Sequence, residues 1–327
     1  MKSTALIMDV DAGVDDTLAV IFALLTPSLR VRAITAVAGN VPVHLCTQNV
    51  LLTLEMLDGL IAVAPPVAKG ASRPLRRALF TAREVHGEDG IGNASAFYDP
   101  PRRRAAPEPA ADLILRMLRG RERLSIVATG PLTNIAAAYK KDPAAMRRVK
   151  EIIVMGGAFE GVWNTGPVAE FNFYVDPEAA DCVMRSGLPV TLIPLNVTHR
   201  CILSPGDLRK VFPIALRRYV QRVTTFYFDF HRRTAGFTGG YLHDPLAVAA
   251  VAHPSFFSYR TGYVRVEGEG KYTRGLSVFI PRLDLRKNAE MPGWVRRTLR
   301  NAPSVRVATG INAASFKREF LAALRKP

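Results

Sequence analysis

The chain has 327 residues, 48% of them hydrophobic, which is enough to bury a large core and argues against a disordered protein. Lys and Arg number 44 against 28 Asp and Glu, so the formal net charge is +16. The basic clusters are dispersed, lack interleaved aromatic residues and match no nucleic-acid-binding motif. We therefore expect no specific nucleic-acid partner.

Strand-like and helix-like patterns alternate along the first 200 residues. Apolar runs predict strands at 5–8, 31–37, 124–128, 151–155 and 190–195. Helical spacing predicts helices at 17–25, 46–57, from 132 onward and from about 176. This alternation is typical of an α/β fold, in which helices flank an open, mostly parallel sheet.

Beyond residue 260 the hydrophobic period changes to two. The segments 263–266 and 276–279 predict a hairpin or a small antiparallel extension near the C-terminus. The chain closes with a helix capped at Asn312 that carries Phe316, Phe320 and Leu324 on one face. Because no linker or repeat interrupts the pattern, we expect residues 1–327 to form a single large domain.

The cysteines and the hydropathy bear on the compartment. Cys46, Cys182 and Cys201 are odd in number and lack metal-type spacing, so free thiols in a reducing compartment fit better than disulfides. The first apolar run is broken at Asp9, too early for the core of a signal peptide, and no stretch approaches a membrane span. We expect a cytoplasmic protein with no membrane partner.

The most informative segment is an acidic loop between the first predicted strand and helix. Asp9, Asp11, Asp15 and Asp16 place four carboxylates within eight residues. Helix capping needs only one of them, whereas four repel one another unless a cation lies among them. A hard divalent cation with oxygen ligands is the simplest solution, and Asp9 is the member best suited to a structural role.

Polar residues also follow the other predicted strands. Asn40, Thr129, Gly156-Gly157 and Asn196 stand at strand ends, and in open parallel sheets such ends meet at one ligand-binding crevice. Further along the chain, His243-Asp244-Pro245 opens a predicted helix. The aspartate could cap that helix or face a metal, and a histidine with a pKa near ~6.5 can donate a proton to a leaving group.

A third polar group comprises Asn164, Glu170 and Asn172. One carboxylate and two carboxamides suit the hydroxyls of a sugar, although an ordinary surface loop has a similar composition.

Together these segments resemble the inosine-uridine preferring nucleoside hydrolases, in the family's order and over nearly the whole chain. The matching segments are 9–16 (DVDAGVDD), 38–40 (AGN), 86–90 (HGEDG), 129–134 (TGPLTN), 155–157 (MGG), 169–172 (AEFN), 176–180 (DPEAA), 243–245 (HDP) and 273–275 (TRG).

The resemblance implies calcium-dependent hydrolysis of the N-glycosidic bond of ribonucleosides, which gives ribose and free base. By the family's pattern, Asp11, Asp16, Asp244 and the carbonyl of Thr129 hold Ca²⁺. The aspartate that matches Asp11 also takes a proton from a calcium-bound water, which attacks the ribose, and His243 matches the histidine that helps the base to leave. Relatives form homodimers or homotetramers.

The resemblance also implies a substrate-binding set. Residues matching the family's ribose contacts are Asp15, Asn40, Asn164, Glu170 and Asn172. Met155 lies in the same pocket wall and His86 on the side of the base. The segment 227–235 corresponds to the helix that faces the nucleobase, where Tyr227, His231 and Ala235 share one face.

The sequence differs from the family's pattern at two positions, and the preferred nucleobase is left open. Ala12 stands where the family usually has proline, which should loosen the turn slightly, and His231 is unusual on the base-facing helix. The base preference is therefore open between inosine and uridine, a broad range, or a purine- or pyrimidine-specific enzyme.

Haloacid-dehalogenase-like phosphatases also begin with a strand and an Asp-x-Asp loop, but they usually have threonine or valine at the position of Gly13. A non-enzymatic nucleoside-binding or scaffold protein would be expected to lack catalytic residues, and none is missing.

Overall fold

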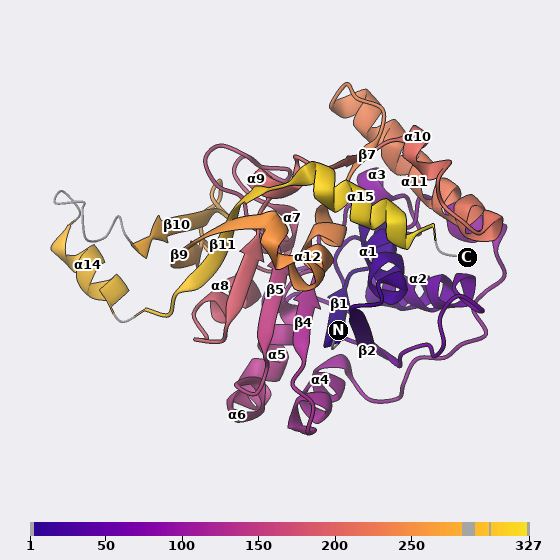
Figure 1. The fold of residues 1–327 in the computed structure, drawn as a ribbon. Helices are drawn as coiled ribbons and strands as arrows, with labels where there is room; N and C mark the ends of the chain where they lie inside the picture. The colour runs from indigo at the N-terminus through magenta and orange to yellow at the C-terminus, as the bar shows by residue number, and fades with distance from the viewer. Residues whose placement is uncertain (1–2, 283–291, 301, 326–327) are drawn as a thin grey trace.

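The computed structural model describes residues 3–282, 292–300 and 302–325 (Figure 1). A nine-stranded sheet runs through the fold in the order β10-β9-β11-β6-β5-β4-β1-β2-β3. Its strands are β1 Thr4–Val10, β2 Leu29–Ala36, β3 Val67–Lys69, β4 Ser125–Ala128, β5 Glu151–Met155, β6 Val190–Ile193, β9 Phe257–Val266, β10 Ser277–Pro281 and β11 Val305–Ile311. A separate two-stranded sheet pairs β7 Ile202–Leu203 with β8 Gly240–Tyr241.

Parallel pairing covers most of the large sheet. β1 lies between β2 and β4, and the parallel ladder continues outward to β3 on one side and through β5 and β6 to β11 on the other. β9 is antiparallel to both β11 and β10. The predicted antiparallel extension is therefore confirmed, and β11 joins it to the parallel part of the sheet.

Helices cover both faces of the sheet, and each face has its own hydrophobic core (Figure 1). One core is built with α1 Val14–Leu25, α2 Val43–Met56, α11 Ile214–Thr234, α12 His243–Ala252 and α15 Ala313–Ala323. The other is built with α4 Ala110–Arg119, α5 Thr133–Lys141, α6 Pro143–Met146 and α8 Pro177–Met184.

Central strand β1 shows why the chain folds in this way. Leu6, Met8 and Val10 pack into the first core, whereas Ala5 and Ile7 pack into the second. A strand that is buried on both faces needs a continuous apolar sequence, and this is what residues 5–8 supply.

The remaining helices are short or lie at the edges of the fold. They are α3 Arg83–His86, α7 Phe171–Val175, α9 Leu195–Thr198, α10 Pro205–Leu208 and α14 Gly293–Arg300, with 3₁₀ turns at Ala94–Phe97 and Pro254–Phe256. Within the described residues, none of the helices combines the length and hydrophobicity needed to cross a bilayer.

The fold class predicted from the sequence is confirmed. The observed strands coincide with the five predicted ones to within two residues at most ends, and Asn312 caps the last helix by accepting a hydrogen bond from the Ser315 N–H. Four strands were not predicted: β3, β7 and β8 are too short to show a period, and β11 lies beyond the segments that were interpreted.

Candidate active site

A cavity of about 650 Å³ opens at the carboxyl ends of the parallel strands. This size and position are typical of a small-molecule site in an α/β sheet. Its wall takes Asp11 from the loop after β1, Asn40 from the loop after β2, Thr129 from the end of β4 and Met155 from the end of β5. The expected convergence of strand ends on one crevice is therefore observed for these residues.

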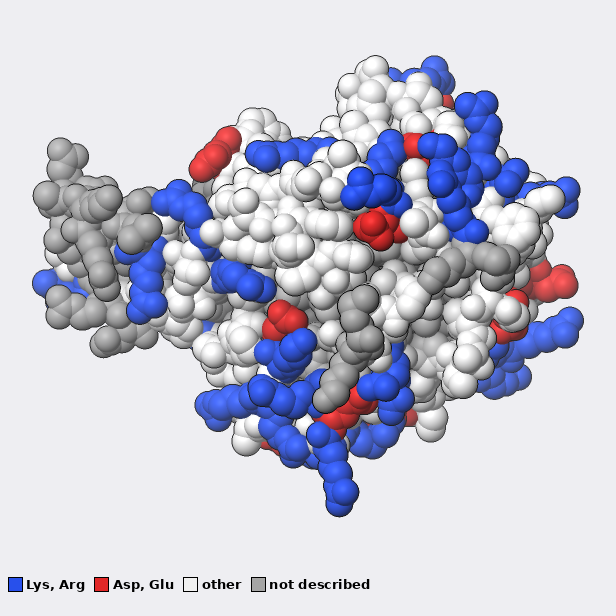
Figure 2. Space-filling view, in the orientation of Figure 1, with Lys and Arg blue, Asp and Glu red and all other residues white. Residues whose placement is uncertain are grey.

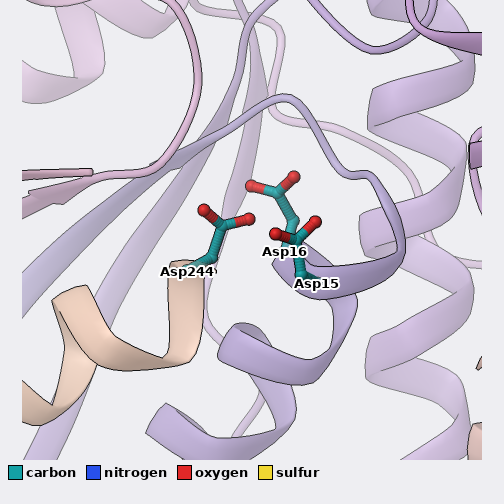
Figure 3. A group of neighbouring side chains, drawn as sticks. All are labelled: Asp15, Asp16 and Asp244. Carbon is teal, nitrogen blue, oxygen red and sulfur yellow. The ribbon is translucent and has the colours of Figure 1, made fainter. Parts of the chain in front are cut away.

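Three carboxylates meet beside this cavity, and two of them, Asp15 and Asp244, line it (Figure 3). Asp15 and Asp16 lie in the first turn of α1, and Asp244 lies in the first turn of α12. All three are buried, and each offers an oxygen atom within 4.8 Å of the others. The N-termini of the two helices partly offset this negative charge, because backbone N–H groups point toward it.

Asp16 is the best-anchored member of the cluster. Its Oδ2 accepts hydrogen bonds from the Gly13 N–H at 2.8 Å and from Asn40 Nδ2 at 3.3 Å. Its Oδ1 accepts a hydrogen bond from the Thr129 hydroxyl at 2.6 Å. These contacts tie together the loops that follow β1, β2 and β4, so the position of Asp16 is determined by three strands.

Asp11 lies against Asp16 but is not among the three carboxylates that meet within 4.8 Å. Its Oδ2 accepts a hydrogen bond from the Asn40 N–H at 2.8 Å, and its carbonyl accepts one from the Cys46 thiol at 2.9 Å. The sequence assigned Asp11 to the metal and Asp15 to the ribose, whereas the structure groups Asp15 with Asp16 and Asp244. Both aspartates border the cavity.

The turn that carries these aspartates follows an unexpected path. Ala12 has φ +45°, which is in the left-handed region, and Asn49 Nδ2 donates a hydrogen bond to its carbonyl at 3.1 Å. Proline cannot adopt this conformation, because its ring holds φ near −65°. The backbone at Ala12 is therefore one that proline could not adopt, whereas the sequence suggested only a looser turn.

Burial and mutual repulsion make this cluster costly to ionise. Burial, together with the charge of Asp16, raises the pKa of Asp11 well above its usual range and that of Asp15 to about 8. The same causes raise the pKa of Asp244. No Lys or Arg is among the described residues that line the cavity. The donor set therefore fits a bound cation, which would supply the missing positive charge.

Asp9, by contrast, has a structural position. Its Oδ1 accepts hydrogen bonds from the Thr35 hydroxyl at 2.5 Å and from Asn134 Nδ2 at 2.8 Å, and it does not line the cavity. Burial raises its pKa to about 7. The sequence-based distinction between Asp9 and the other three aspartates agrees with this geometry.

The expected ribose side is assembled around Glu170 and Asn172. Buried Glu170 accepts hydrogen bonds from the N–H groups of Asn172 at 2.8 Å, Gly157 at 3.0 Å and Phe173 at 3.1 Å. Asn172 Nδ2 donates to the carbonyl oxygens of Thr129 at 2.7 Å and Met155 at 3.2 Å. A rigid network of acceptors and donors therefore borders the acidic cluster.

Asn164 also lines the cavity but is exposed. Its Oδ1 accepts a hydrogen bond from the Phe171 N–H at 2.9 Å.

Aromatic and histidine side chains form another part of the cavity wall. His86 stacks on Tyr227 with ring centroids 5.6 Å apart, and Tyr227 packs edge-on against His231 at 4.4 Å. The His86 Nδ1 accepts a hydrogen bond from the Val14 N–H at 3.1 Å. The His231 Nδ1 donates to the Tyr227 carbonyl at 2.8 Å, because a carbonyl can only accept.

Gly13 is essential to this arrangement. A Cβ atom at Gly13 would lie 2.8 Å from His86 Nδ1 and 2.4 Å from Asn40 Nδ2, distances that are too short for normal contacts. The glycine thus allows the base-side histidine and Asn40 to approach the acidic loop.

His243 lies beside this wall, directly before Asp244. Its Nδ1 is 2.7 Å from the Thr198 hydroxyl. Burial lowers its pKa well below 6.5, and the neighbouring His199, His231 and His86 lower it further. The sequence treated His243 as a histidine of ordinary pKa, whereas burial in the folded protein favours the neutral ring.

Sequence reasoning missed His199 and Tyr241, which also line the cavity. Their rings stack with centroids 4.5 Å apart. The strand-end rule pointed to this region but selected Asn196, which does not line the cavity: it exchanges two hydrogen bonds with the backbone of Phe159. His199, three residues further on, is the residue that reaches the site.

Comparisons with known proteins identify the family of this chain. The profile of the family described as inosine-uridine preferring nucleoside hydrolase matches residues 6–318. The chain belongs to this family. It is 38% identical over 273 residues to uridine nucleosidase 1 of Arabidopsis thaliana, covering 82% of this chain and 80% of that protein. It is 39% identical over 279 residues to the pyrimidine-specific ribonucleoside hydrolase RihA of Klebsiella pneumoniae, covering 84% and 87%.

Solved structures of nucleoside hydrolases are similar over nearly the whole chain. A plant nucleoside hydrolase, PpNRh1, has a TM-score of 0.90 and 33% identity and covers 99% of both chains. The purine-preferring ribonucleoside hydrolase of Gardnerella vaginalis has a TM-score of 0.86 and 31% identity and covers 98% of both. The protein is therefore a nucleoside hydrolase, and the phosphatase and scaffold alternatives are set aside.

Proposed function

We propose that this nucleoside hydrolase binds calcium through Asp11, Asp16, Asp244 and the Thr129 carbonyl, with Asp15 as a further candidate ligand. The supporting observation is a buried group of carboxylates in a cavity whose described lining contains no Lys or Arg. Calcium accepts six to eight oxygen ligands in flexible geometry, which suits carboxylates and a carbonyl. When bound, the ion would lower the pKa of a water molecule at the cluster.

Asp11 is proposed as the general base that takes a proton from the water that attacks the anomeric carbon of the ribose. Cleavage of an N-glycosidic bond passes through an oxocarbenium-like state with positive charge on the sugar. The anionic cluster stabilises that state more than it stabilises the neutral substrate, which lowers the barrier. The ribose hydroxyls are proposed to bind to Asp15, Asn40, Asn164, Glu170 and Asn172, with Met155 in the adjoining wall.

The base is proposed to bind at the aromatic wall. His86, Tyr227 and His231 border it there, and His243 assists its departure. Uridine is our first candidate substrate, because relatives at 38–39% identity are named for uridine or pyrimidine nucleosides. Inosine remains the second candidate, because a structural relative is named as purine-preferring. We further propose that residues 1–327 act as one domain, in a cytoplasmic homodimer or homotetramer.

A substrate panel tests this function. Purified protein with calcium is incubated with uridine, cytidine, inosine, guanosine and adenosine, and reducing sugar is measured. We expect ribose release from uridine or inosine at least tenfold above that of an Asp11→Asn variant, which removes the proposed base. Absence of sugar from all five nucleosides would contradict the proposal. A p-nitrophenyl phosphate control should release no phosphate above background.

A further inference from the structure

Thr198 lies at the end of α9, directly behind His243. Its side chain is completely buried, with 0% of its surface exposed, so no solvent reaches the hydroxyl group. Among the described residues, the Thr198 hydroxyl has a single hydrogen-bond partner, which is His243 Nδ1 at 2.7 Å. This contact could not be expected from sequence patterns, because 45 residues separate the two positions.

The direction of this hydrogen bond follows from what each group can offer. A hydroxyl carries one proton that it can donate, and a buried donor without an acceptor costs considerable free energy. Within the described part of the chain, Nδ1 in its unprotonated form is the one acceptor that the Thr198 hydroxyl contacts. If Nδ1 carried a proton, both groups would be donors and the hydroxyl proton would have no partner. Nδ1 is therefore the acceptor, and the ring proton resides on Nε2.

We infer that Thr198 is a positioning residue that holds His243 in the Nε2–H tautomer, so that an N–H group faces the departing nucleobase. This inference rests on the proposed role of His243 in base departure. As the bond between ribose C1′ and the base nitrogen breaks, its electron pair passes to the base. The Nε2–H group donates a hydrogen bond to the base atom on which that charge collects. The proton remains on the ring, and the base leaves as an anion that takes up a proton from water after departure.

In two other histidines of this pocket, His86 and His231, the tautomer of the ring is also determined by one hydrogen bond. The Val14 N–H gives His86 the same tautomer as His243, since its Nδ1 must also accept. The Tyr227 carbonyl gives His231 the opposite tautomer, with Nδ1–H as donor. The partners of His86 and His231 are backbone groups, which a substitution does not remove. The partner of His243 is the side chain of Thr198, so a substitution can remove it.

The test compares Thr198→Val, which keeps the branched shape but removes the hydroxyl, with Thr198→Ser, which keeps the hydroxyl. We expect Thr198→Val to lower kcat/KM for uridine by about 10- to 100-fold, and Thr198→Ser to stay within about threefold of the wild type. p-Nitrophenyl riboside, whose leaving group needs little assistance, should be cleaved at nearly the wild-type rate by both variants.

A matched control removes a buried hydroxyl elsewhere. Thr26 donates to the Phe22 carbonyl at 2.6 Å and does not line the cavity. Thr26→Val should change thermal stability but leave the ratio of uridine to p-nitrophenyl riboside efficiency unchanged. The inference is overturned if Thr198→Val cleaves uridine normally, or if it loses both substrates equally.

Nitrogen-15 NMR of histidine-labelled protein provides a second measurement that needs no variant at position 198 to fold. The His243 signals, assigned by comparison with His243→Asn, should show an unprotonated Nδ1 and a protonated Nε2 in the wild type. A protonated Nδ1 would overturn the inference.

The variant His243→Ala distinguishes a failure of the proposed role of His243 from a failure of the inference about Thr198. If it cleaves uridine normally, the proposed role of His243 fails and the inference falls with it. If it loses uridine hydrolysis while Thr198→Val does not, only the inference about Thr198 fails.

Discussion

Asp16 occupies the most connected position in the acidic cluster, and its replacement gives the most direct test of the proposed metal ligands. We expect Asp16→Asn to abolish stoichiometric calcium binding and nearly all turnover, because the change removes the charge and replaces one of the two oxygens that accept hydrogen bonds from three loops. Elemental analysis and calorimetry measure the bound metal.

Asp9→Asn is the matched control, since Asp9 is equally buried but does not belong to the group formed by Asp15, Asp16 and Asp244. This variant should retain calcium. A variant at Asp16 that still binds one calcium ion per chain would refute the ligand assignment.

His231 is the residue whose chemistry differs most from expectation on the base-facing helix. Since its Nδ1–H donates to the Tyr227 carbonyl, its Nε2 is left as a hydrogen-bond acceptor in the cavity wall. We expect His231→Ala to change the ratio of uridine to inosine efficiency by about tenfold, the usual scale of one hydrogen bond to a bound ligand. Cleavage of p-nitrophenyl riboside should change little.

The exposed neighbour Arg232 on the same helix supplies a control. Arg232→Ala should leave all three substrates unaffected. Equal losses on uridine, inosine and p-nitrophenyl riboside in His231→Ala would mean that His231 stabilises the fold and does not select the base.

Ala12 stores backbone strain beside the acidic cluster. A non-glycine residue in the left-handed region costs about 1 kcal/mol, which glycine avoids. We expect Ala12→Gly to raise the free energy of unfolding by up to about 1 kcal/mol, partly offset by the greater freedom of glycine in the unfolded chain. Urea titration of the metal-free wild type and variant measures this difference in the free energy of unfolding. A less stable variant would show that the packing of the Ala12 methyl group contributes more than the strain costs.

At this scale the sequence was informative where the residues of a site are neighbours in the chain. The acidic loop could be recognised because its carboxylates are consecutive or nearly so. Thr198 and His199 could not, because a one-turn helix has no detectable period and only the folded sheet brings α9 next to α12. The left-handed backbone at Ala12 could not be predicted either, since no sequence pattern indicates this conformation at an alanine.

Among the secondary-structure elements, α7 has an unusual N-cap. Glu170 is buried there, and burial raises its pKa from 4.5 to about 7 despite three hydrogen bonds from backbone N–H groups. The folded protein therefore holds this proton more tightly than the unfolded chain does. Between about pH 4.5 and pH 7, the proton is bound in the folded state and lost in the unfolded state, so stability falls as pH rises.

The predicted pH dependence can be isolated by substitution. A difference of this size between folded and unfolded pKa corresponds to about 3 kcal/mol. In the metal-free protein, the free energy of unfolding should decline more steeply between pH 4.5 and pH 7 in the wild type than in Glu170→Gln, which cannot titrate. Parallel curves for the two proteins would show that Glu170 ionises normally in the folded state.

The predicted elements were reliable wherever burial on both faces demanded continuous apolar runs, as in β1, β4, β5 and β6. β2 is an instructive exception, since Arg30 and Arg32 give its first half an alternating pattern, yet its buried second half still identified it. The N-terminal half of α11 was not predicted, although this 21-residue helix carries Tyr227 and His231. Its mixture of basic and apolar residues gave no clear boundary.

For the whole molecule, the charge of the surface differs in sign from the charge of the candidate active site. Figure 2 shows Lys and Arg side chains spread over the visible face, many of them near the lower edge where α4, α5 and α6 lie. Several are paired with acidic neighbours, such as Arg119 with Asp142 and Arg116 with Glu108. The lining of the candidate active-site cavity, in contrast, is acidic. The net charge of +16 thus says little about the chemistry of the site.

The strand order could not be predicted from the sequence, but the ligand-binding crevice that results from it could be predicted. β1 lies beside both β2 and β4, which places the acidic loop at the point where the chain crosses from one half of the sheet to the other. Ligands bind at such points in open α/β sheets, and this general rule was sufficient to predict the crevice. Which loops would meet there depended on crossovers that local patterns do not encode.

The central claim is that a cation held by this acidic cavity enables ribonucleoside hydrolysis. The most direct test is ribose release from uridine, or from the best substrate of the panel, by protein stripped with a chelator and then titrated with calcium. We predict negligible release from the stripped protein and recovery that saturates near one calcium ion per chain. Full activity in the stripped protein would contradict the account.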